Sequence, residues 1–113
     1  MPYDYRRPTQ TWVRVNVRHC RELGLRIEVL REGEPRRGSV AVKLCQPGVG
    51  CRILTQTRNA EGTVCWLSAT GDRRLSESEA ASYLERAVSR DPDLWIVEVE
   101  HPQGENPFRG EVI

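Results

Sequence analysis

Arginine side chains at helical spacing are the first candidates for chemistry in this chain. Arg14, Arg18 and Arg21 fall at i, i+4 and i+7 within residues 10–23, so a helix would align them in one stripe. Guanidinium groups bind phosphates and carboxylates through paired hydrogen bonds. The stripe predicts either an ordinary solvated helix face or a surface that contacts an anion, a nucleic acid or an acidic partner.

Cysteines are the second group of candidates. The chain has four, Cys20, Cys45, Cys51 and Cys65, but it has no Cys-x-x-Cys, and the spacing of Cys45 and Cys51 is not typical of structural zinc. The first residues lack the apolar core of a signal peptide, so we expect a cytoplasmic protein, in which disulfides are rare. We therefore expect buried thiols, no metal and no cofactor. The alternative is a small enzyme or metal protein that uses Cys45, Cys51 and His19.

Carboxylates form two pairs towards the C-terminal end. Asp91 and Asp93 flank Pro92, where they can serve a turn and a helix end, or else bind an arginine of a partner or a divalent ion. Glu98 and Glu100 share one face of a predicted strand, and paired carboxylates do acid–base chemistry when their pKa values differ. A solvated face is the favoured interpretation. Since no convergent catalytic set is evident, we expect a binding protein rather than an enzyme.

Residues 10–23, which carry the arginine stripe, are predicted to form a helix. Apolar side chains recur there at helical spacing, although three valines in the same stretch also alternate as in a strand. We choose the helix because Thr9 or Thr11 can cap its start and Gly24 stands where a helix C-terminal glycine belongs.

The stretch of residues 90–100 organises the predicted fold. The capping box Ser76-x-x-Glu79 begins a second helix, and Pro92 requires this helix to end near Arg90. Residues 94–100 then form a strand that is buried on both faces at its start and on one face at its end. The predicted core includes Trp95, Val97, Trp12 and Leu84.

Four further strands are predicted at 25–31, 39–45, 51–58 and 63–68. Their short links suggest that the first two form a hairpin and that the sheet is mostly an antiparallel meander. The predicted fold is α+β: a mostly antiparallel sheet of about five strands with two helices packed on it, in the order α-β-β-β-β-α-β. Residues 10–100 would form the single domain, with residues 1–9 as a flexible arm and residues 101–113 as a loosely ordered tail.

Three segments carry a family resemblance. They are Trp12-Val13 with Arg18, Cys20 and Gly24; Arg31, Gly33 and Gly38 before a Val-x-Val-Lys43 strand; and Asp91-Pro92-Asp93-Leu94-Trp95 with Glu98. In these segments the chain resembles an uncharacterised bacterial family, domain of unknown function 1491, from which residues 46–70 depart most. The resemblance implies a small α+β protein, and it transfers no catalytic residue because the family has no established activity.

Composition limits the classes of function. The net charge of +1 gives no general attraction to nucleic acid or an anionic membrane, and no apolar run is long enough to span a bilayer. We therefore expect a non-catalytic interaction or adaptor module whose partner is another protein, bound through an exposed sheet edge. The alternative is a binder of nucleic acid or another anion through the arginine stripe with Arg36, Arg37, Arg73 and Arg74, although few aromatic residues near these arginines could stack on bases.

Overall fold

The computed structural model describes residues 7–113, and this part of the chain forms two helices and five strands. In chain order they are α1 (Thr9–Glu22), β1 (Arg26–Arg31), β2 (Val40–Gln46), β3 (Gly50–Arg58), β4 (Val64–Ser68), α2 (Glu77–Arg90) and β5 (Trp95–Glu100). The α+β class, the two helices and the sheet of five strands are confirmed. Neither helix combines the length and apolar character that crossing a membrane requires. The expected flexible arm falls mostly on residues 1–6, outside the described residues.

Helix α1 is capped differently at its two ends. Its N-cap is Pro8, and no side chain caps it, so the expected Thr9 or Thr11 cap is wrong. The Thr9 hydroxyl instead donates to the Gly38 carbonyl at 2.9 Å, which ties the helix to the loop between β1 and β2. The C-terminal end follows the expectation, because Gly24 has φ +81° and its N–H donates to the Arg21 carbonyl.

Helix α2 begins with the expected capping box. Ser76 accepts from the Glu79 N–H at 3.1 Å, while the Glu79 carboxylate accepts from the Ser76 N–H at 2.9 Å. Ala80 and Leu84 are its buried residues, and the helix ends at Arg90 before Pro92. A tight turn then leads into β5.

The sheet is mixed, and this corrects the expectation of a mostly antiparallel meander. The strand order is β1-β5-β2-β3-β4, so β5 lies between β1 and β2, which therefore form no hairpin. Strand β5 pairs antiparallel with β1 and parallel with β2, where Val97 is opposite Val42. The physical reason is burial: β5 begins with three buried apolar residues, Trp95, Ile96 and Val97, and a position inside the sheet covers both of its faces.

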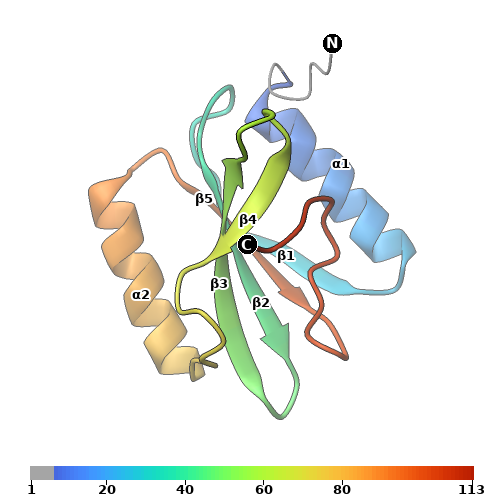
Figure 1. Cartoon of the computed structure of the whole chain (residues 1–113), viewed down its shortest axis with the longest axis vertical. Coiled ribbons are helices and arrows are strands. Elements are labelled where there is room, and N and C mark those ends of the chain that lie inside the picture. The colour runs from blue at the N-terminus through green and yellow to red at the C-terminus, as the bar shows by residue number, and fades with distance from the viewer. Residues whose placement is uncertain (1–6) are drawn as a thin grey trace.

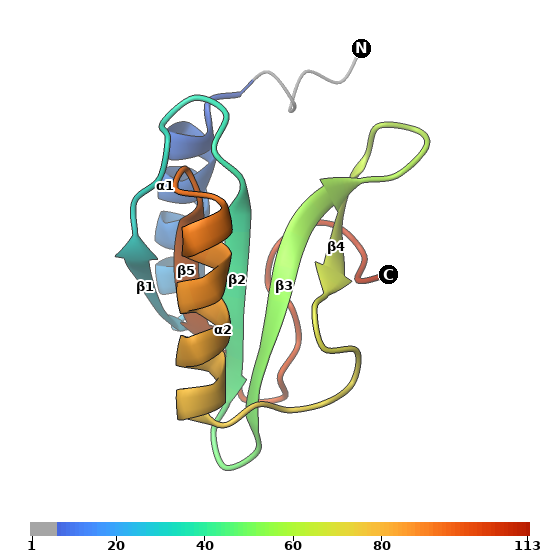
Figure 2. The same ribbon diagram turned by 90° about the vertical axis from the view of Figure 1, so that its left-hand side faces the viewer.

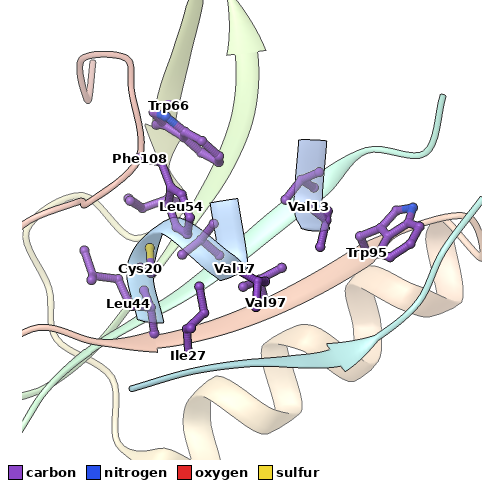
Figure 3. Close-up of a cluster of buried hydrophobic side chains, with 13 residues drawn as sticks. Val13, Val17, Cys20, Ile27, Leu44, Leu54, Trp66, Trp95, Val97 and Phe108 are labelled. Carbon is purple, nitrogen blue, oxygen red and sulfur yellow. The ribbon is translucent and has the colours of Figure 1, made fainter. Parts of the chain in front are cut away.

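The two helices cover opposite faces of the sheet (Figures 1 and 2). On the α1 face, Val13, Val17 and Cys20 pack against Trp95 and Val97, with Trp66 and Phe108 at one end (Figure 3). On the α2 face, the core consists of Ala41, Cys45, Cys51, Ile53, Leu75, Ala80, Leu84, Leu94 and Ile96. Trp95 is only 3% exposed and Leu84 6%, while Trp12 is partly buried against the first core.

The C-terminal segment of residues 101–113, expected as a loosely ordered tail, contacts the end of β2 through His101 and Pro102 and lies beside β4 only over residues 108–113. Phe108 is 4% exposed, and its ring lies 5.6 Å from that of Trp12 and 5.8 Å from that of Trp66. The Trp66 indole donates to the Arg109 carbonyl at 3.0 Å, and Val112 forms a parallel bridge with Trp66. Residues 108–113 thus cover part of the β4 edge, held by the buried Phe108 ring and by hydrogen bonds with Trp66.

Candidate functional site

The three arginines of the predicted stripe lie together on one wall of a groove. We call it the basic groove; its volume is about 500 Å³, and it lies between α1 and β1. The α1 wall carries Gln10, Val13, Arg14, Val17, Arg18 and Arg21, the β1 side carries Glu28, Val29 and Glu32, and Trp95 completes the lining. The sequence found the arginines, but the groove depends on how α1 packs beside β1.

The basic groove combines an apolar floor with a charged rim. Val13, Val17 and Trp95 are buried, whereas Arg14, Arg18 and Arg21 are exposed. None of the ion pairs found within residues 7–113 includes one of these three arginines. Their charges are therefore available to a ligand, and the floor offers apolar area that a ligand could cover.

Strand β1 supplies the free edge of the sheet beside this groove. The opposite edge, β4, is partly covered by the bridge to Val112, but β1 is paired only on its β5 side within the described chain. The register shifts between Val29 and Arg31, and Leu30 between them is 45% exposed. An open edge presents backbone N–H and C=O groups that a further strand can pair with.

The other arginines that the sequence singled out do not join this groove. Arg36 and Arg37 lie in the loop between β1 and β2, which meets the start of α1, because the Thr9 N–H donates to the Arg36 carbonyl at 3.1 Å. Arg73 and Arg74 precede α2, and Arg73 pairs with Glu79 at 2.6 Å. The structure therefore does not gather the arginines into one continuous basic surface.

Asp91 and Asp93 serve the turn between α2 and β5. Asp91 is the C-cap of α2, and its carboxylate accepts from the Asp93 N–H at 3.1 Å. The Asp93 carbonyl accepts from the Glu34 N–H at 3.0 Å. Neither aspartate lines the basic groove, so any binding role for them would be separate from it.

A second group of polar side chains lies on the α2 face of the sheet. Its central residue, Lys43, was not among the functional candidates that the sequence suggested. Lys43 is buried, with its ammonium 2.5 Å from the Glu77 carboxylate and 2.7 Å from the Glu98 carboxylate. Burial acts to lower the pKa of Lys43, but the hydrogen bonds to Glu77 and Glu98 outweigh it and raise that pKa. Glu100 pairs with Arg26 at 3.5 Å, so Glu98 and Glu100 each have a cation.

Cys45 and Cys51 are joined by a disulfide beside this group, which corrects the expectation of free thiols. The reason is register: β2 and β3 place the two residues directly opposite each other, with Cα atoms 4.1 Å apart. The signal was in the sequence, because Gln46-Pro47-Gly48-Val49-Gly50 is a turn with a cysteine on each side. His19 belongs to α1 on the other face of the sheet, so the Cys–His group of the alternative hypothesis does not form.

Cys20 and Cys65 are the free cysteines, and both are buried. Burial raises the pKa of the Cys20 thiol, which disfavours its reactive thiolate form. Cys20 therefore behaves as a small apolar residue on the buried face of α1.

The structure is that of a small α+β protein with a groove beside one edge of its sheet. A family model described as "Protein of unknown function (DUF1491)" matches residues 8–109, so the chain belongs to this family. The resemblance noted in the sequence is thereby confirmed. Comparison with curated proteins gives no match.

Solved structures share this fold. The crystal structure of a DUF1491 family protein from Caulobacter crescentus CB15 is 29% identical with a TM-score of 0.81, covering 94% of this chain and 98% of that chain. An NMR structure of a DUF1491 family protein from the same organism is 28% identical with a TM-score of 0.81, covering 96% and 97%. Protein Atu0922 from A. tumefaciens, at 19% identity, covers 85% and 86% with a TM-score of 0.71, and it shows the fold alone.

Proposed function

We propose that this protein is an interaction module that binds an extended, acidic segment of a partner protein in the basic groove. The observation that carries the proposal is the row of three arginines, unpaired within residues 7–113, above an apolar floor and beside the free edge of β1. A segment added to β1 would gain backbone hydrogen bonds from the edge and side-chain contacts from the groove.

The spacing of the arginines suits a strand. A helix advances about 1.5 Å per residue, so Arg14 and Arg18 are about 6 Å apart along α1. Side chains on one face of a strand recur about every 6.6 Å. Alternate acidic residues of a bound strand could therefore meet successive arginines, while the apolar residues between them point to the other face, where they can cover exposed Leu30.

Charge favours a protein segment over a nucleic acid as the ligand. Glu28 and Glu32 line the side opposite the arginines, where they would repel a phosphate backbone that fills the groove. A peptide can place carboxylates against α1 and neutral or basic groups against β1.

The experiment measures binding of a short fluorescent peptide of alternating valine and glutamate residues. We expect the Arg14→Ala/Arg18→Ala variant to bind it about tenfold more weakly, which corresponds to about 1.4 kcal/mol for two exposed charge contacts. The matched control is Arg86→Ala/Arg90→Ala, which removes two exposed arginines at the same i, i+4 spacing from α2. Equal weakening by both variants would contradict the proposal.

Two further ligands separate the modes of binding. A peptide N-methylated at alternate residues keeps its charges but loses the backbone donors that strand addition needs, so it should bind much more weakly. A single-stranded oligothymidylate tests the nucleic-acid alternative. If the oligonucleotide binds more tightly than the acidic peptide, with steep salt dependence, the groove is a nucleic-acid site instead.

A further inference from the structure

The disulfide between Cys45 and Cys51 lies in a hollow with carboxylates around it. This hollow, of about 400 Å³, is lined by the turn between β2 and β3, by the start of α2, and by Glu98 and Glu100 of β5. The two sulfurs and a carboxylate oxygen of Glu77 all lie within 4.8 Å of one another. This hollow opens on the α2 face, so it is separate from the basic groove.

The backbone fixes Glu77 close to the sulfurs. Cys51 and Leu75 exchange two hydrogen bonds, of 2.9 and 2.8 Å, which hold the start of α2 against β3. Glu77 is the first residue of α2, two residues beyond Leu75. The distance between Glu77 and the cysteines is therefore set by the fold and does not depend on the disulfide alone.

Lys43 orients the Glu77 carboxylate. Its ammonium contacts Oε2 of Glu77 at 2.5 Å, while Oε1 lies 3.9 Å from the Cys51 sulfur. One oxygen is thus held by a buried cation, and the other faces the sulfurs. Carboxylate ligands of metals are commonly held by such a neighbouring hydrogen bond.

We propose that the reduced form of this site binds one zinc ion through the Cys45 and Cys51 thiolates and the Glu77 carboxylate. A dithiol reductant first converts the disulfide to two thiols and is itself oxidised to a disulfide. Zinc then displaces the two thiol protons, which pass to solvent. The fourth coordination position opens into the hollow and takes a water molecule.

The chemistry of the donors selects a soft divalent cation. Thiolates favour zinc over magnesium and calcium, which prefer sites made of oxygen ligands. Glu98 and Glu100 add negative charge nearby. Once both thiols are ionised, the positive charges of Lys43 and Arg26 do not balance the negative charges around the hollow, so a divalent cation is attracted. Because the same sulfurs form either the disulfide or the zinc bonds, oxidation and zinc binding exclude each other.

The test uses the whole chain, which is first reduced with a dithiol. The dithiol is then removed under oxygen-free conditions, and the zinc ion alone is added as the probe. Competition with a chromophoric chelator measures affinity and stoichiometry. We expect one zinc per reduced chain, none in the oxidised chain, and loss of this site in Cys45→Ala. Cobalt in place of zinc should give a sulfur-to-metal charge-transfer band that disappears with the same variant.

Matched variants separate ligand loss from misfolding. Glu77 is an exposed residue, so Glu77→Gln should keep the far-ultraviolet circular dichroism unchanged while it weakens zinc binding at least tenfold. Glu85→Gln, an exposed acid on the same helix, and Cys65→Ala should leave zinc affinity unchanged. The proposal is overturned if the reduced chain binds no zinc, if oxidised chain binds it equally, or if the control variants weaken binding as much as Glu77→Gln does.

Discussion

Replacing Trp95 by alanine tests how the sheet, the loop and the groove depend on one side chain. Trp95 is 3% exposed, it lines the basic groove, and its indole N–H donates to the Glu34 carbonyl at 2.7 Å. Burying a tryptophan removes roughly 150–250 Å² from water, which is worth about 4–6 kcal/mol before entropy. Measured truncations of buried aromatic residues cost about 3–5 kcal/mol, and we expect about 4 kcal/mol here.

The assay is denaturant unfolding followed by circular dichroism, because the substitution changes tryptophan fluorescence. A loss of about 4 kcal/mol should also lower Tm by about 15 °C or more for a domain of this size. The control is Leu67→Ala, which truncates a 45% exposed residue on β4 and should change stability by less than about 0.5 kcal/mol. An unfolding midpoint unaffected by Trp95→Ala would refute the assignment of β5 to the interior of the sheet.

Three further predictions concern Gly38, Lys43 and Glu34. Gly38→Ala should cost at least about 2 kcal/mol in thermal unfolding, because a Cβ there would lie 2.5 Å from the Asp93 carbonyl oxygen and 2.9 Å from the Trp95 ring. Lys43 has a raised pKa in the folded state, so its contribution to the free energy of unfolding is present below about pH 10.4 and is lost as pH rises through the folded pKa. The free energy of unfolding of Lys43→Met should therefore fall less at alkaline pH than that of the unsubstituted protein. Hydrogen bonds from the Arg37 and Arg36 N–H groups lower the pKa of Glu34, so its contribution to the free energy of unfolding is lost as pH falls below about 4. Glu34→Gln should therefore make the free energy of unfolding less dependent on pH on the acid side.

Local pattern was enough to predict the elements of this fold. Alternation defined the strands to within a residue or two, the Ser76–Glu79 capping box located the start of α2, and Pro92 located its end. These signals depend on neighbours a few residues apart, where sequence and conformation are directly linked.

Strand order could not be read in the same way. The loop between β1 and β2 looks like a hairpin connection, yet β5 from the far end of the chain lies between these strands. Nothing local in residues 32–39 records that insertion, because it is decided by which strand gains most from burial on both faces. The C-terminal segment posed the same difficulty, since one aromatic residue, Phe108, anchors an otherwise polar stretch.

The candidate sites were predictable in part for the same reason. Arg14, Arg18 and Arg21 are near neighbours on one helix, so their spacing revealed the stripe, but the groove needs β1 beside it. The Cys45–Cys51 pairing follows from hairpin register, whereas Glu77 reaches the sulfurs through the fold of the whole chain.

Mapping the bound peptide by NMR tests the central claim most directly. The isotope-labelled chain would be titrated with the peptide of alternating valine and glutamate, and backbone amide shifts would be followed residue by residue. The account predicts that the largest shifts fall on β1 and on the α1 wall around Arg14 and Arg18, with new protection of β1 amides from exchange. Shifts centred on α2 or β4, or none at saturating peptide, would contradict it.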